Sequence, residues 1–77
     1  MDDHDIHARV SALVAEEHAL RDQGVTTDDD RTRLRQLEEQ LDQCWDLLRQ
    51  RDALRGAGSS PEGAAVRPVG EVEGYLQ

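Results

Sequence analysis

The feature that most constrains this 77-residue chain is a row of apolar side chains that recurs in alternating steps of three and four residues. The row consists of Leu34, Leu37, Leu41, Cys44 and Leu48. Because these steps return to one side of an α-helix, they predict a long helix whose apolar seam packs against another helix. Trp45, Leu47 and Leu54 lie beside the seam and widen it. Gly56 follows at once, so we expect the helix to span residues 28–55.

A shorter helix is predicted ahead of this one, over residues 3–22. Its apolar residues fall at helical spacing, at Ile6, Val10, Leu13, Val14 and Leu20. Gly24 then suits a left-handed helix end, and Thr27 with Asp30 resembles a capping box with aspartate in place of glutamate. A connection of about five residues between two helices favours an antiparallel hairpin.

The size of the chain indicates that this hairpin does not stand alone. Charged residues make up 34% of the chain and aromatic residues only 3%, so few large apolar side chains are available for a core. The long helix also outreaches the short one by roughly 10 Å, which leaves its last turns without a partner inside the hairpin. We therefore predict an all-α fold in which an antiparallel two-helix hairpin, residues 1–55, dimerises into a four-helix bundle.

The C-terminal third lacks helical periodicity and is expected to be irregular. Residues 56–65 are small and polar and contain Pro61, which favours a flexible linker. Apolar residues return among glycine and proline in residues 66–77, which indicates an extended tail. Two interpretations of this tail stay open, a short docking motif and a frayed chain end.

Charge and composition argue against several classes of partner and compartment. A net charge of −8 repels the phosphates of nucleic acids and anionic lipids, so neither nucleic acid nor membrane is an expected partner. No apolar run approaches the roughly 20 residues of a membrane span, and no signal-peptide pattern is present. The one cysteine can form no internal disulfide, so we expect a cytoplasmic protein.

No pattern of residues points to catalysis, a cofactor or a built metal site. The sequence contains no phosphate-binding glycine loop, no nucleophile motif and no zinc-type cysteine spacing. Cys44 lies on the seam, where a thiol packs as a small apolar group. In the hairpin register His7 falls at the level of Trp45, next to Cys44, so the spacing also allows a Cys–His pair. His4 and His7 are three residues apart and could share a metal ion, against the simpler alternative of a solvated helix start. We expect a protein that is not an enzyme.

Several stretches of the sequence together resemble one known family. They are Leu13–His18, Arg35–Glu38, Leu41–Arg51 and Val72–Tyr75. In these stretches the chain is similar to the actinobacterial domain-of-unknown-function family 2630, over nearly its whole length, and the block Leu41–Arg51 is the most specific part. The resemblance implies an actinobacterial, cytoplasmic protein that forms one continuous unit, and it implies no particular activity.

These observations favour a protein-interaction adaptor or small regulator with an unknown protein partner. The residues predicted to bind that partner lie on the unpaired end of the long helix and in the tail: Trp45, Leu47, Leu48, Arg51, Leu54, Tyr75 and Leu76. Trp45 is the best single candidate for an interface hot spot in a chain so poor in aromatic residues. The alternatives are a structural protein whose self-assembled helical oligomer is its function, and a metal-responsive protein that uses the N-terminal histidines.

Overall fold

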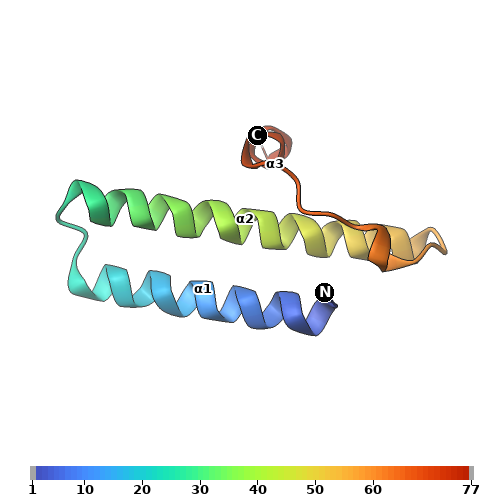
Figure 1. The fold of residues 1–77 in the computed structure, drawn as a ribbon, viewed down its shortest axis with the longest axis horizontal. Coiled ribbons are helices and arrows are strands. Elements are labelled where there is room, and N and C mark those ends of the chain that lie inside the picture. The colour runs from blue at the N-terminus through green and yellow to red at the C-terminus, as the bar shows by residue number, and fades with distance from the viewer. Residues whose placement is uncertain (1, 77) are drawn as a thin grey trace.

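The computed structural model describes the backbone of residues 2–76 and the side chains of residues 2–72. Over this part of the chain it contains helices and no strands, in the order α1 (Asp3–Gln23), α2 (Asp28–Gly56), the short 3₁₀ helix η1 (Pro61–Gly63) and α3 (Val69–Leu76). α1 and α2 pack side by side in opposite directions, and α2 extends beyond the start of α1 (Figure 1). The prediction of an all-α antiparallel hairpin is confirmed.

Local hydrogen bonds determine where the hairpin turns. α1 ends at Gly24, whose φ of 93° lies in the left-handed region that favours glycine. α2 begins after Thr27, whose hydroxyl accepts a hydrogen bond from Asp30 N at 3.1 Å, while the Asp30 carboxylate accepts one from Thr27 N at 3.4 Å. This reciprocal pair is the capping box that the sequence predicts. Asp2 and Asp5 form an equivalent capping box at the start of α1.

The core is small and surrounds α2. Its buried apolar side chains are Ile6, Val10, Leu13, Leu37, Leu47, Leu48 and Val72. Ile6, Leu47 and Leu48 form one cluster, against which Cys44 and Ala64 pack. The apolar positions of α1 therefore face α2, as their helical spacing predicts.

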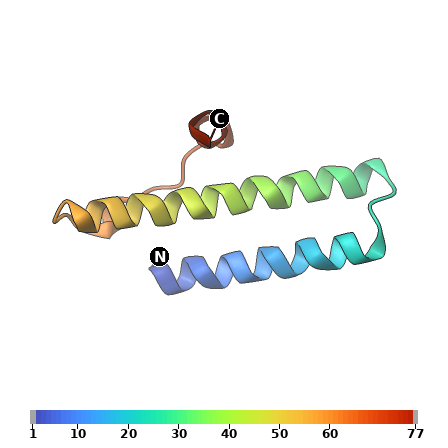
Figure 2. The same cartoon turned by 180° about the vertical axis from the view of Figure 1, so that it is seen from behind.

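The C-terminal third folds back onto α2, which differs from the expected flexible linker and extended tail. Residues 59–68 run back along α2, and α3 lies across the side of α2 that points away from α1 (Figures 1 and 2). The C=O of Pro68 accepts backbone hydrogen bonds from Glu71 and Val72, which starts α3, and Val72 is fully buried. Periodicity misses this arrangement because both helices are short and their partners are far away in the sequence. Gln77, at the end of the predicted tail, lies outside the described residues.

The molecule is elongated and thin. Its radius of gyration is 14.4 Å, against about 11–12 Å for a compact domain of this length. Its extents are 47 × 25 × 15 Å, so along the shortest axis it is little thicker than a single helix with its side chains. No helix in residues 2–76 is long and apolar enough to cross a membrane. Dimerisation into a four-helix bundle stays a prediction.

Candidate functional site

α2 carries two polar flanks that differ in what covers them. The tail flank, which faces residues 64–68, consists of Gln43, Asp46 and Gln50. The open flank, whose members are all exposed, consists of Glu38, Trp45, Arg49 and Asp52. Steps of three, four and seven residues place each set along one side of the helix. α2 therefore offers one surface that the chain itself covers and one that faces solvent.

Asp46 is the centre of the tail flank. Its side chain is 0% exposed, and the Arg67 guanidinium meets it with two groups, of which Nε donates to Oδ2 at 2.8 Å. Gln50 Nε2 donates a second hydrogen bond to Oδ2 at 2.8 Å. The hydrogen bonds from Arg67 hold the pKa of the Asp46 carboxyl below its ordinary value, although burial acts in the opposite direction. The buried carboxylate is therefore ionised and paired at neutral pH.

The two glutamines of the tail flank bind backbone atoms of the C-terminal segment. Gln50 Nε2 donates to the C=O of Ala65 at 2.8 Å, and Ala65 N donates to Gln50 Oε1 at 3.3 Å. Gln43 Nε2 donates to the C=O of Arg67 at 3.2 Å. The segment is thus held mainly by contacts to its backbone and to one guanidinium.

A second charged cluster joins the two ends of the chain beside the last turns of α2. Arg51, only 5% exposed, donates to the Asp3 carboxylate and to the C=O of Pro61, and its guanidinium lies 3.6 Å from Glu62. Arg55 Nη2 lies 2.6 Å from Asp3. The pKa of Asp3 is lowered by the hydrogen bonds from Arg55 and then from Arg51. The sequence predicts that Arg51 lies on the overhang of the long helix, without a partner in the hairpin. In the structure it contacts residues of both α1 and η1.

The apolar residues predicted to bind a partner are largely covered by the chain itself. Leu47 and Leu48 are buried in the cluster with Ile6. Leu54 is half-buried and lies beside Gly63 of η1. The side chains of Tyr75 and Leu76 lie outside the described part of the chain, and the predicted role of all these residues in partner binding stays a prediction.

Among the predicted residues whose side chains the structure describes, Trp45 is the exposed one, with 44% of its surface accessible. His7 of α1 contacts it edge to face, with ring centroids 6.5 Å apart and an interplanar angle of 74°. A shallow pocket of about 230 Å³ opens beside the indole. It is lined by Asp3, His7, Trp45, Leu48, Arg49 and Asp52. The open flank therefore combines an aromatic surface with charged groups of both signs.

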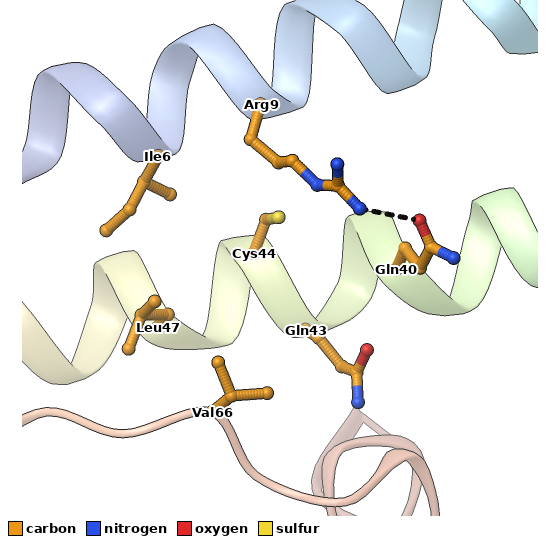
Figure 3. Close-up of a pocket in the computed structure, with 7 residues that line it drawn as sticks. All are labelled: Ile6, Arg9, Gln40, Gln43, Cys44, Leu47 and Val66. Carbon is orange, nitrogen blue, oxygen red and sulfur yellow. Dashed lines mark hydrogen bonds between the residues drawn. The ribbon is translucent and has the colours of Figure 1, made fainter. Parts of the chain in front are cut away.

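A second pocket, of about 170 Å³, surrounds Cys44 between α1, α2 and the C-terminal segment (Figure 3). Arg9 Nη2 donates to Gln40 Oε1 at 3.2 Å at one end of it, and Val66 lies at the other (Figure 3). Burial raises the pKa of the Cys44 thiol, although the nearby charge of Arg9 acts in the opposite direction. His7 contacts Trp45, and the thiol stays protonated at neutral pH, so Cys44 has the properties of a packing residue.

The N-terminal histidines lie on the exposed surface of α1. His4 and His7 are both exposed. Among the side chains of residues 2–72, no three of His, Cys, Asp or Glu are grouped so that they could hold a metal ion. The structure therefore gives no geometric support to the metal-responsive alternative.

The polar contacts of the tail flank are the part of the site that sequence reasoning missed. Asp46 lies on the polar side of α2, where an acidic residue reads as a solvated charge. The one available signal is that Arg67 is the sole basic residue among residues 56–77. Nothing local in the sequence identifies Asp46 as its partner, because 21 residues separate the two.

Comparison with known proteins agrees with the resemblance drawn from the sequence. Two relatives are the uncharacterized proteins Rv0898c of Mycobacterium tuberculosis and Mb0922c of Mycobacterium bovis, each 53% identical to the chain over 72 residues. Each alignment covers 88% of this chain and 83% of the relative. No solved structure matches the chain. The model of the family of proteins of unknown function DUF2630 matches residues 2–77, and the chain therefore belongs to that family.

Proposed function

We propose that the protein is a non-enzymatic protein-interaction module that self-associates through the open flank of its hairpin. Trp45 is the observation that carries this proposal, because the only tryptophan of the chain is 44% exposed. Tryptophan is among the residue types most enriched at interface hot spots, where a partner removes it from water. The pocket beside the indole supplies room for a side chain of the partner.

Charges on the open flank favour a second copy of the chain as that partner. Glu38 lies seven residues before Trp45, and Arg49 lies four residues after it. Within the chain the Glu38 carboxylate already accepts a hydrogen bond from Arg21 Nη2 at 3.1 Å, so an arginine of a second copy would share that carboxylate. When two α2 helices pair in opposite directions about a twofold axis near residues 43 and 44, Arg49 of each copy faces Glu38 of the second copy. The two indoles are then offset by about 4.5 Å along the helix axis, within reach of each other. Two ion pairs would flank a pair of tryptophans.

The remaining surface properties support binding of protein in preference to catalysis or binding of nucleic acid. The pockets are shallow, and the thiol in one of them is protonated at neutral pH. A net charge of −8 opposes contact with phosphate backbones and anionic lipid headgroups. A thin hairpin with a small core also gains stability from burying a flank against a second hairpin.

Sedimentation equilibrium across a range from micromolar to millimolar chain tests the proposal. We expect a dimer that Trp45→Ala weakens by about 30-fold or more, since truncating a hot spot costs at least about 2 kcal/mol. Val66→Ala is the matched control, because Val66 is the other large exposed apolar side chain within residues 2–72, at 63%, and lies away from the open flank. Its dissociation constant should equal that of the wild-type chain. A wild-type chain that is a monomer at millimolar concentration, or equal effects of the two substitutions, would overturn the proposal.

A structural oligomer is the second candidate, because the same exposed indole would support it. The two candidates differ in whether assembly stops at a fixed number of chains. A twofold pairing uses the flank of both copies and stops at a discrete dimer mass. A mass that continues to grow with concentration would favour the structural oligomer.

A further inference from the structure

The contacts on the tail flank have the pattern of a peptide-binding site. Gln50 pairs with both the N–H and the C=O of Ala65, and Gln43 donates to the C=O of Arg67. These three hydrogen bonds are made to backbone atoms, which every peptide possesses. The remaining contact, between Asp46 and the guanidinium of Arg67, selects one type of side chain. The flank therefore recognises a segment by its backbone and by a single arginine.

Asp46 makes a guanidinium a requirement for whatever lies on this flank. Its side chain is 0% exposed, and a buried carboxylate without a cationic partner is strongly disfavoured. The guanidinium meets both carboxylate oxygens, a two-pronged geometry that arginine provides and lysine does not. A segment that displaces residues 65–68 and buries Asp46 in its turn must therefore bring an arginine of its own.

The segment that now covers the flank has few apolar contacts of its own. Val66 is 63% exposed, and Arg67 is one-third exposed. Ala64 packs on the core cluster at one end, and Val72 of α3 is buried at the other. Between these two anchors, residues 65–68 adopt no helical structure and are held by polar contacts. Such a segment can exchange with another that offers the same groups.

We propose that the tail flank of α2 is a docking site for a basic, non-helical peptide segment with an arginine, and that residues 65–68 occupy it in cis in the free chain. The arginine of the partner replaces Arg67 at Asp46, and the residue two positions before it pairs with Gln50 through its backbone. A chain with a net charge of −8 attracts basic segments, which favours such a partner over an acidic one.

The site is separate from the proposed dimer surface and goes beyond it. Asp46 and Trp45 are adjacent in sequence but point about 100° apart around the helix, one toward the C-terminal segment and one toward solvent. In the free chain the tethered segment competes at an effective concentration of about a millimolar. A partner peptide therefore binds the wild-type chain weakly, and binds tightly once the tethered arginine is removed.

Fluorescence anisotropy with full-length chains and a labelled peptide tests this competition. The peptide has the sequence of residues 63–70, which contains Arg67 and no acidic residue, and the receptor is the wild-type chain or the variant Arg67→Ala. We expect the variant to bind the peptide at least tenfold more tightly than the wild-type chain, because its own C-terminal segment no longer has an arginine that pairs with Asp46. A second substitution in the same chain, Asp46→Asn, should weaken binding at least tenfold, and a peptide with Arg67→Ala should lose binding altogether.

Two controls keep the test decisive. Trp45→Ala should leave peptide binding equal to that of the wild-type chain, so a failure of the dimer proposal and a failure of this one are distinguished. If circular dichroism shows that Arg67→Ala does not fold, Arg67→Lys replaces it, because lysine keeps the charge but not the two-pronged contact. Equal affinity of the wild-type chain and the folded Arg67 variant, or binding that Asp46→Asn leaves unchanged, would overturn the proposal.

Discussion

Replacing Arg67 with alanine is expected to release the C-terminal segment from α2. The substitution removes both groups through which Arg67 meets the Asp46 carboxylate and leaves the hydrogen bond from Gln50 in place. Removing one partner of a buried ion pair costs about 3–5 kcal/mol. Because Arg67 is 34% exposed at its side chain, water screens part of the pair, and we expect a loss of about 2–3 kcal/mol. For a domain of this size that loss lowers Tm by roughly 10–20 °C.

The dependence of stability on pH follows from the same pair. The hydrogen bonds from Arg67 hold the pKa of Asp46 below its ordinary value of 3.8, although burial opposes them. A carboxyl group with a lowered pKa in the folded chain stabilises it above that ordinary value, and the contribution is lost as the pH falls through the folded pKa. We expect the wild-type chain to lose stability below about pH 4, and the Asp46→Asn chain to lose less over the same range.

Urea unfolding followed by circular dichroism at 222 nm measures these effects for the wild type, Arg67→Ala, Asp46→Asn and the double variant. The double variant should be more stable than the sum of the two single losses implies, since it leaves no buried charge without a partner. The reasoning is refuted if Arg67→Ala costs less than about 0.5 kcal/mol, or if the two single losses simply add.

Three further predictions follow from other contacts. Each of the charge reversals Glu38→Arg and Arg49→Glu on the open flank should weaken the dimer in sedimentation equilibrium, and the double reversal should restore it. A double variant that forms a weaker dimer than both single variants would contradict the twofold register. Thr27→Ala should lower the free energy of unfolding in urea by about 1 kcal/mol through loss of the capping box, with Thr26→Ala as the exposed control that leaves stability unchanged. Cys44 should react with iodoacetamide at pH 7.5 at least tenfold more slowly than free cysteine, because burial raises the pKa of its thiol; an equal rate would show that the thiol is not shielded.

The hairpin was predictable because its signals are local. The steps of three and four from Leu34 to Leu48 specify one helix face, and Thr27 with Asp30 marks the start of α2 within four residues of sequence. Gly24 needs no more than its own backbone freedom to end α1. Each of these features can be recognised without knowing what lies elsewhere in the chain.

The C-terminal third was not predictable on those terms. α3 is eight residues long and contains Gly70 and Gly74, which weaken its intrinsic helical preference. It depends on contacts with α2, and the decisive pair, Asp46 with Arg67, joins residues 21 apart. A long-range ion pair leaves no periodic trace in the sequence, so the segment looks like a linker and a tail.

The candidate site was predictable only in part for a related reason. A lone tryptophan is conspicuous in composition, so the sequence alone points to Trp45, and the structure leaves its side chain exposed. Leu47, Leu48 and Arg51 were expected on an uncovered overhang of the long helix, but η1 and the start of α1 cover them. Helical spacing indicates only one partner for α2, namely α1, whereas the folded chain supplies a second from its own C-terminal third.

The position of α2 between its two neighbours has a consequence for how the chain folds and opens. Within residues 2–76, the backbone of α1 approaches α2 but not η1 or α3, and the backbones of η1 and α3 approach α2. The hairpin involves contacts close in sequence, so it can form rapidly before the C-terminal segment docks. Opening should then proceed in two cooperative units, with the C-terminal segment leaving first and the middle of α2 keeping its amide protons longest in hydrogen exchange. α2 is thus the helix that should form first and open last, and the other helices pack onto it in turn.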